Sequence, residues 1–138
     1  MPTPEEIAVA SEWVAKAESD LRAAAALLRM KDCPTDAVCF HAQQAVEKYL
    51  KALLTALGIE FPKTHHIGKL VQLVERHHRI ELSESEQDSL SDYATTARYP
   101  GFGEIPVSEA RRAVSVARRV HKQIRLLLPK ETTRTRRH

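Results

Sequence analysis

The chain contains few of the residues that build turns, strands and disulfide frameworks. Only four of its 138 residues are glycine, and aromatic residues make up 5%. This composition argues against a fold rich in strands and turns. The two cysteines, Cys33 and Cys39, match no metal-ligand or redox spacing. They do not support a disulfide scaffold, and we interpret them as reduced thiols, with Cys39 packed inside a helix.

Long apolar runs are also missing. No segment approaches the run of about 18 uninterrupted apolar residues that indicates a transmembrane helix. Residues 1–6 carry two glutamates, where a secretory signal peptide has a basic region. We therefore expect a cytoplasmic protein that makes no contact with a membrane.

Most of the chain has no excess of either charge. The net charge is +3, but residues 130–138 contain four basic residues and one acidic residue, which leaves 17 of each sign in residues 1–129. A terminus of this composition is typical of solvated, disordered chain. We expect one domain over residues 1–129 and a basic disordered tail over residues 130–138. Bulk charge therefore gives no argument for nucleic-acid binding.

Helical periodicity is the strongest feature that is present. Apolar residues recur at three- and four-residue steps in five segments. The predicted helices start at a cap on Thr3, around Thr35, at a cap on Thr64, at a capping box on Ser83 and at Ser108. They end between Lys31 and Pro34, at Gly58, after Val74, before Pro100 and before Pro129. Because the connections are short and each helix has one apolar stripe, we expect an all-α antiparallel bundle of about five helices.

One segment resembles a known family. Residues 39–54, CFHAQQAVEKYLKALL, are similar to the second-helix signature of prokaryotic HEPN proteins (higher eukaryote and prokaryote nucleotide-binding domain). The resemblance continues in residues 13–21, 58–65 and 93–100 and in Glu109-Ala110, so it covers nearly everything except the tail. It implies a helical bundle that is usually dimeric. Members of the family include ribonuclease toxins paired with minimal nucleotidyltransferase antitoxins, and proteins described only as nucleotide-binding.

The ribonuclease members of that family carry an arginine followed, after four to six residues, by a histidine. Both side chains must reach one scissile phosphate, the arginine to stabilise charge and the histidine as an acid or base. Arg98 lies at the corresponding place in this chain. The three positions that would hold the histidine are occupied by Gly103, Glu104 and Ile105. The motif is absent, so we assign no catalytic residue.

A polar stripe runs along the predicted second helix. His41, Gln44, Lys48, Lys51 and Thr55 recur at helical spacing, with Glu47 beside them. Such a stripe is most often a solvated face. The functional alternative is a nucleotide- or phosphate-binding groove, in which two lysines hold phosphate as point charges, Arg98 clamps it and Tyr99 stacks on a base. The candidate residues for binding nucleotide or RNA are His41, Gln44, Glu47, Lys48, Lys51, Arg98 and Tyr99.

Other clusters give weaker signals. The pairs His65-His66 and His77-His78 do not predict a metal site, because adjacent histidines point to different helix faces and no acid or cysteine completes a familiar spacing. We interpret His65 as part of a helix start. The basic residues Arg111, Arg118, Lys122 and Arg125 are typical of a solvated or helix-facing surface rather than an RNA track. We expect no metal and no cofactor.

Two function classes follow. The first is a homodimeric binding module that acts with a nucleotidyltransferase partner and contacts nucleotide or RNA. The homodimer is expected because the largely apolar second helix has more hydrophobic surface than one core stripe needs. The second is a metal-independent ribonuclease toxin with a non-standard site around Arg98, in which His41 replaces the missing histidine.

Overall fold

The structure, a computed structural model, describes residues 1–133. These residues form six α-helices and one 3-10 turn and contain no strand. The elements in order are α1 (Pro4–Leu28), α2 (Thr35–Ala56), α3 (Ile67–Val74), α4 (Glu84–Ala94), η1 (Thr96–Arg98), α5 (Val107–Leu127) and α6 (Lys130–Thr133). The predicted all-helical bundle is confirmed.

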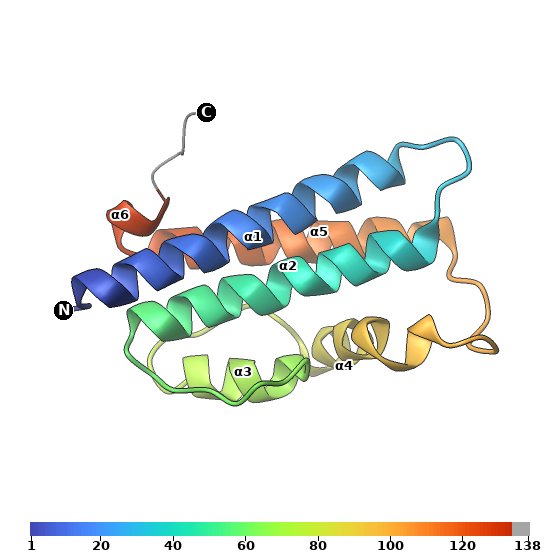
Figure 1. The fold of residues 1–138 in the computed structure, drawn as a ribbon. Helices are drawn as coiled ribbons and strands as arrows, with labels where there is room; N and C mark the ends of the chain where they lie inside the picture. The colour runs from blue at the N-terminus through green and yellow to red at the C-terminus, as the bar shows by residue number, and fades with distance from the viewer. Residues whose placement is uncertain (134–138) are drawn as a thin grey trace.

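Helix α2 is the centre of the bundle. It contacts α1, α3, α4 and α5, and most of its residues are buried. Helices α1 and α5 lie along one side of it, while α3 and α4 lie on the other (Figure 1). Consecutive α1 and α2 run antiparallel, as expected from their short connection, but α2 and α5 run in the same direction (Figure 1). The excursion through α3 and α4 returns the chain to the end at which α2 began.

The central position of α2 changes one argument made from the sequence. Its apolar surplus was expected to pair with a second copy of the chain. The large residues Leu50, Leu53 and Leu54 are fully buried within this single chain. Because four neighbouring helices already cover α2, its apolar surface no longer argues for a homodimer.

Two predicted helix starts are confirmed by their capping boxes. The Thr3 hydroxyl accepts a hydrogen bond from the Glu6 N–H at 3.1 Å, and the Glu6 carboxylate accepts one from the Thr3 N–H at 2.8 Å. Ser83 and Glu86 make the same reciprocal pair at the start of α4, at 3.1 and 2.9 Å. Each box satisfies backbone donors that the first helical turn leaves free.

Other boundaries differ from the prediction. Helix α3 is capped by His66, whose Nδ1 accepts from the Lys69 N–H at 3.2 Å, and not by Thr64. The Thr64 hydroxyl instead accepts a hydrogen bond from the backbone N–H of His66, the residue that caps the helix. Helix α4 ends at Ala94 and does not continue through Ala97 to Pro100, because the chain tightens into the 3-10 turn η1. Helix α5 begins at Val107, one residue before the predicted start.

The expectation of a disordered tail from residue 130 is wrong for its first four residues. Residues 130–133 form the short helix α6, which packs against α1. Thr132 is buried there, and its hydroxyl donates to the Pro129 carbonyl at 2.7 Å. Pro129 therefore ends α5 and begins another turn. The rest of the expected tail, residues 134–138, lies outside the described residues.

Candidate functional site

The polar stripe of α2 is organised around two carboxylates. One is Glu47 on α2 itself, and the other is Asp20 on α1, which was not among the residues selected from the sequence. We name the first group the Glu47 cluster (Gln43, Glu47, Lys51 and His65) and the second the Asp20 group (Asp20, His41 and Lys48).

Glu47 is 3% exposed and has a hydrogen-bond partner on each oxygen. Its Oε1 accepts from Gln43 Nε2 at 2.8 Å and lies 2.8 Å from His65 Nδ1, while its Oε2 accepts from Lys51 Nζ at 2.9 Å. Gln43 and Lys51 flank Glu47 at positions i−4 and i+4, so one helix face supplies both. The Lys51 ammonium also lies 5.3 Å from the centre of the Trp13 ring.

The Glu47 cluster holds the linker after α2 onto the helix. His65 comes from that linker, and its side chain contacts Glu47 through Nδ1. Lys51 is 8% exposed and already has an acidic partner. Most of the phosphate-binding capacity expected of Lys51 is therefore used inside the fold.

The Asp20 group joins α1 to α2. Asp20 Oδ1 lies 2.9 Å from His41 Nδ1, and Asp20 Oδ2 accepts from Lys48 Nζ at 2.5 Å. Gln44, the remaining stripe residue, donates to the Gln43 side-chain oxygen at 2.7 Å. Lys48 is thus neutralised by an acid from another helix.

Arg98 is the last residue of η1, and Tyr99 begins the connection from η1 to α5. The Arg98 guanidinium carbon is 4.6 Å from the centre of the Phe40 ring, and Phe40 in turn makes an edge contact with His41 at 5.6 Å between ring centres. Phe40 lies about 12 Å along the axis of α2 from Lys48, at 1.5 Å per residue. The structure therefore brings Arg98 against Phe40, the residue before His41, and places Lys48 and Lys51 farther along the helix.

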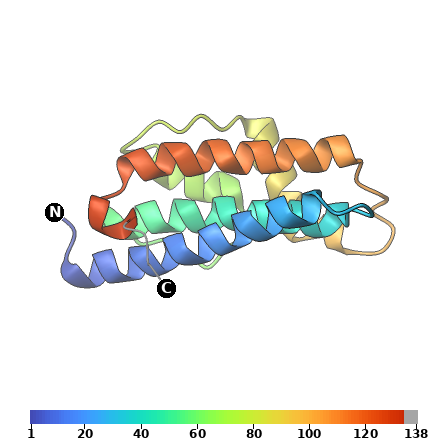
Figure 2. The same ribbon diagram turned by 90° about the horizontal axis from the view of Figure 1, so that it is seen from above.

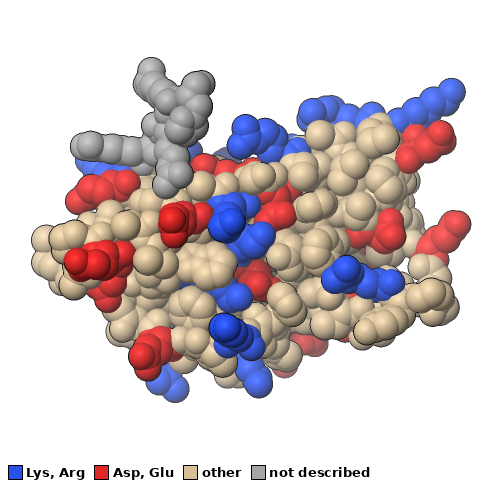
Figure 3. Space-filling view, in the orientation of Figure 1, with Lys and Arg blue, Asp and Glu red and all other residues tan. Residues whose placement is uncertain are grey.

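The face of the molecule seen in Figure 3 carries charges of both signs. Basic and acidic side chains are interspersed on it instead of forming one patch of either sign. Among residues 1–133, no three His, Cys, Asp or Glu side chains gather so as to hold a metal ion. None of the helices in that range combines the length and apolarity needed to cross a membrane.

The comparisons with known proteins agree with the resemblance noted in residues 39–54. Residues 10–127 match the family model of the HEPN domain. This chain belongs to the HEPN family. A protein of Methanocaldococcus jannaschii that bears the name putative toxin is 35% identical to it over 109 residues, which cover 72% of this chain and 70% of that protein. No solved structure matches the chain.

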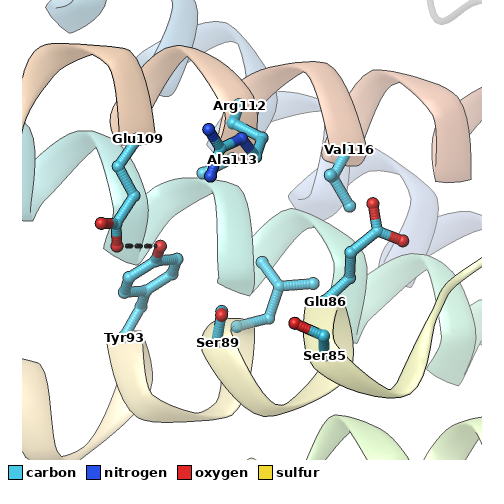
Figure 4. A pocket seen from close by; sticks show the side chains of 9 residues that line it. Ser85, Glu86, Ser89, Tyr93, Glu109, Arg112, Ala113 and Val116 are labelled. Atoms are coloured by element: carbon cyan, nitrogen blue, oxygen red, sulfur yellow. Dashed lines mark hydrogen bonds between the residues drawn. The ribbon is translucent and has the colours of Figure 1, made fainter.

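A pocket of about 190 Å³ lies between α4 and α5 of this HEPN domain. The Tyr93 hydroxyl donates to Glu109 Oε2 at 2.6 Å across one end of it, as the dashed line in Figure 4 marks. Burial raises the pKa of Tyr93, and the bond to Glu109 raises it further. The tyrosine therefore keeps its proton at neutral pH. None of the residues selected from the sequence lines this pocket.

Proposed function

We propose that this HEPN domain is one member of a toxin–antitoxin-like pair: a cytoplasmic, homodimeric module that binds nucleotide or RNA and acts with a minimal nucleotidyltransferase partner. The family match and the relative named as a putative toxin support the class of protein. The homodimer, the partner and the ligand rest on the family resemblance. The absence of the family's histidine after Arg98 favours a binding role over cleavage.

The observation that carries the binding proposal is the surface around Arg98. Its guanidinium stacks on the Phe40 ring, which orients a cation that is itself exposed. Tyr99 beside it is 72% exposed, an unusual position for a large aromatic side chain. A fixed arginine next to an accessible ring suits a phosphate and its neighbouring base. Lys48 and Lys51 contribute less, because each has an acidic partner.

A second candidate, the metal-independent ribonuclease, is favoured by the geometry of His41. Asp20 holds its Nδ1, an arrangement that orients an imidazole for acid or base chemistry through Nε2. Arg98 and His41 contact the same Phe40 ring at 4.6 and 5.6 Å, so the guanidinium carbon and the imidazole centre are at most about 10 Å apart. Groups at that separation can approach one phosphodiester from two sides.

The deciding experiment incubates structured RNA with the wild type, Arg98→Ala and His41→Gln in the presence of a chelator. We expect no specific cleavage by any of them, because general acid–base help is worth roughly 10²- to 10⁴-fold and the family histidine is missing. We also expect RNA or nucleotide binding that Arg98→Ala weakens. Arg112→Ala on α5 is the matched control, since it removes an exposed arginine that lines the α4–α5 pocket. Cleavage that disappears in both site variants would replace the binding proposal with the ribonuclease.

The assembly is tested separately. Co-expression with the nucleotidyltransferase encoded beside this chain should yield a complex that survives gel filtration. Light scattering of the chain alone should show a dimer. A species near 15.6 kDa at micromolar concentration would contradict the homodimer, and the absence of a stable complex would contradict the partner.

A further inference from the structure

A groove runs between α1 and α5 on the side of α1 away from Asp20. It encloses about 420 Å³ and has Tyr49 of α2 at its floor. Figure 2 looks down on this side of the molecule, where α2 is seen between α1 and α5. The walls are formed by Glu18, Leu21, Arg22 and Ala25 from α1 and by Arg118 and His121 from α5.

Two buried polar atoms at the floor have no hydrogen-bond partner within residues 1–133. They are Tyr49 Oη and His121 Nε2, on rings whose centres are 5.1 Å apart. Tyr49 is 2% exposed. Buried polar atoms are almost always paired in native proteins, so two adjacent exceptions call for an explanation. A ligand that accepts hydrogen bonds from both would supply it.

The floor is neutral and the rim is basic. Burial lowers the pKa of His121; the carboxylate of Glu18 acts in the opposite direction and the guanidinium of Arg125 in the same direction. Burial likewise raises the pKa of Tyr49, so the phenol keeps its proton. Arg22 and Arg118 line the groove, and no ion pair within residues 1–133 involves either of them or Arg125. Glu18 is the single acid among the lining residues.

We propose that the α1–α5 groove binds a phosphate monoester of mononucleotide size. Tyr49 Oη and His121 Nε2 donate to phosphate oxygens at the floor, and Arg22 and Arg118 clamp the same group from the rim. The groove volume of about 420 Å³ falls in the range of small-molecule pockets, about 300 to 1,000 Å³. It is also larger than the space that a single bridging water needs. Because the floor atoms are buried, the ligand reaches them when the exposed rim side chains move aside.

This site is independent of the proposed function at Arg98. Glu18 and Asp20 are two residues apart on α1, and at 100° per residue they point to nearly opposite sides of the helix. The groove therefore lies on the other side of α1 from the Asp20 group. Either site can be removed without the other, and the experiment uses that separation.

The binding test titrates the full chain with inorganic phosphate, adenosine 5′-monophosphate and adenosine, followed by calorimetry and by the ¹⁵N shifts of the His121 ring. We expect the two phosphates to bind and to move the His121 Nε2 resonance, and adenosine to do neither. Tighter binding of the nucleotide than of phosphate assigns the ligand to nucleotides; equal binding assigns it to free phosphate. No binding of either phosphate at millimolar concentration overturns the proposal.

Variants identify the site. Tyr49→Phe removes one oxygen and should weaken phosphate binding at least ten-fold while raising the melting temperature, because it deletes an unpaired buried hydroxyl. Arg118→Gln, a surface change that leaves the core intact, should weaken binding by a similar factor. Arg112→Gln, from the α4 side of the same helix, is the control and should bind as the wild type does.

Three results contradict the assignment. An equal loss in Arg112→Gln and Arg118→Gln indicates non-specific attraction to a basic helix. A loss in Arg98→Ala with full binding in Tyr49→Phe places the nucleotide at the Arg98 surface, which supports the proposed function and not this groove. A crystal structure grown with the nucleotide that shows only a water bridging the floor atoms also refutes the groove as a ligand site.

Discussion

Replacing Glu47 tests whether the Glu47 cluster is a structural ion pair. Glu47→Gln keeps the size of the side chain and removes its charge. The Lys51 ammonium, 10% exposed as a side chain, then has no acidic partner within the described residues. Removing one member of a buried pair costs about 3 to 5 kcal/mol, because the other charge stays desolvated without compensation.

That loss is large for a domain of this size. Total stability is about 5 to 15 kcal/mol, so the substitution removes about 30 to 50% of a mid-range value of about 10 kcal/mol. The melting temperature should fall by roughly 12 to 20 °C, given about 4 °C per kcal/mol for a domain of this length. Urea unfolding followed by circular dichroism measures the change directly. Glu60→Gln, an exposed glutamate in the linker after α2, is the control and should stay within about 0.5 kcal/mol.

A double variant separates the charge from the packing. Glu47→Leu with Lys51→Met removes both charges together, so the cost of an unpaired ammonium disappears. We expect the pair to lose less stability than Glu47→Leu alone, although Gln43 and His65 still lose an acceptor. The reasoning is refuted if Glu47→Gln costs under about 1 kcal/mol, or if the two substitutions are additive, which would mean no coupling across the 2.9 Å contact.

Two further predictions concern titratable groups. Burial raises the pKa of Cys39 to about 12, so iodoacetamide at neutral pH should modify the partly exposed Cys33 in the folded chain and reach Cys39 only on unfolding; equal rates would contradict its burial. Partial burial acts to raise the pKa of Glu86, but hydrogen bonds from Ser83 and Arg119 outweigh it and leave the pKa below the ordinary 4.5. Its stabilising contribution is therefore present above pH 4.5 and lost as the pH falls through the lower folded value. Arg119→Gln should flatten the loss of stability between pH 5 and pH 3 in urea unfolding, and an unchanged slope would refute the role of that ion pair.

The elements were predictable from the sequence because their signals are local. Periodicity and capping residues are read along one helix, which is why the starts at Thr3 and Ser83 are right. The cap of α3 was misplaced by two residues because Thr64 and His66 both have a side chain able to accept a backbone hydrogen bond, and the sequence does not say which one meets the first turn. The turn at residues 130–133 was missed because its burial depends on α1, which is distant in the sequence.

The site was predictable only where its contacts stay within one helix. Glu47 and Lys51 are four residues apart on one helix, so their ion pair could have been predicted from the sequence. Interpreting Lys51 as a phosphate ligand did not take that pairing into account. Asp20 pairs with Lys48 across two helices, and no pattern along either one reveals that contact. The unpaired Tyr49 hydroxyl is also a tertiary feature, since its position in an apolar stripe predicted only burial.

Residues 39–54, which resemble the family signature, are therefore evidence for the fold more than for the chemistry. Within residues 39–54, Gln43, Glu47 and Lys51 are buried and bonded to one another, so they stabilise the central helix whatever the domain binds. The exposed polar groups left for a ligand come from elsewhere: Arg98 from η1 with Tyr99 after it, and Arg22 and Arg118 from the rim of the α1–α5 groove, whose floor includes Tyr49 of this segment. These four exposed residues can change without disturbing the packing of α2. The match in residues 39–54 therefore leaves the ligand of this chain open, because the exposed cations that would select a ligand lie outside that segment.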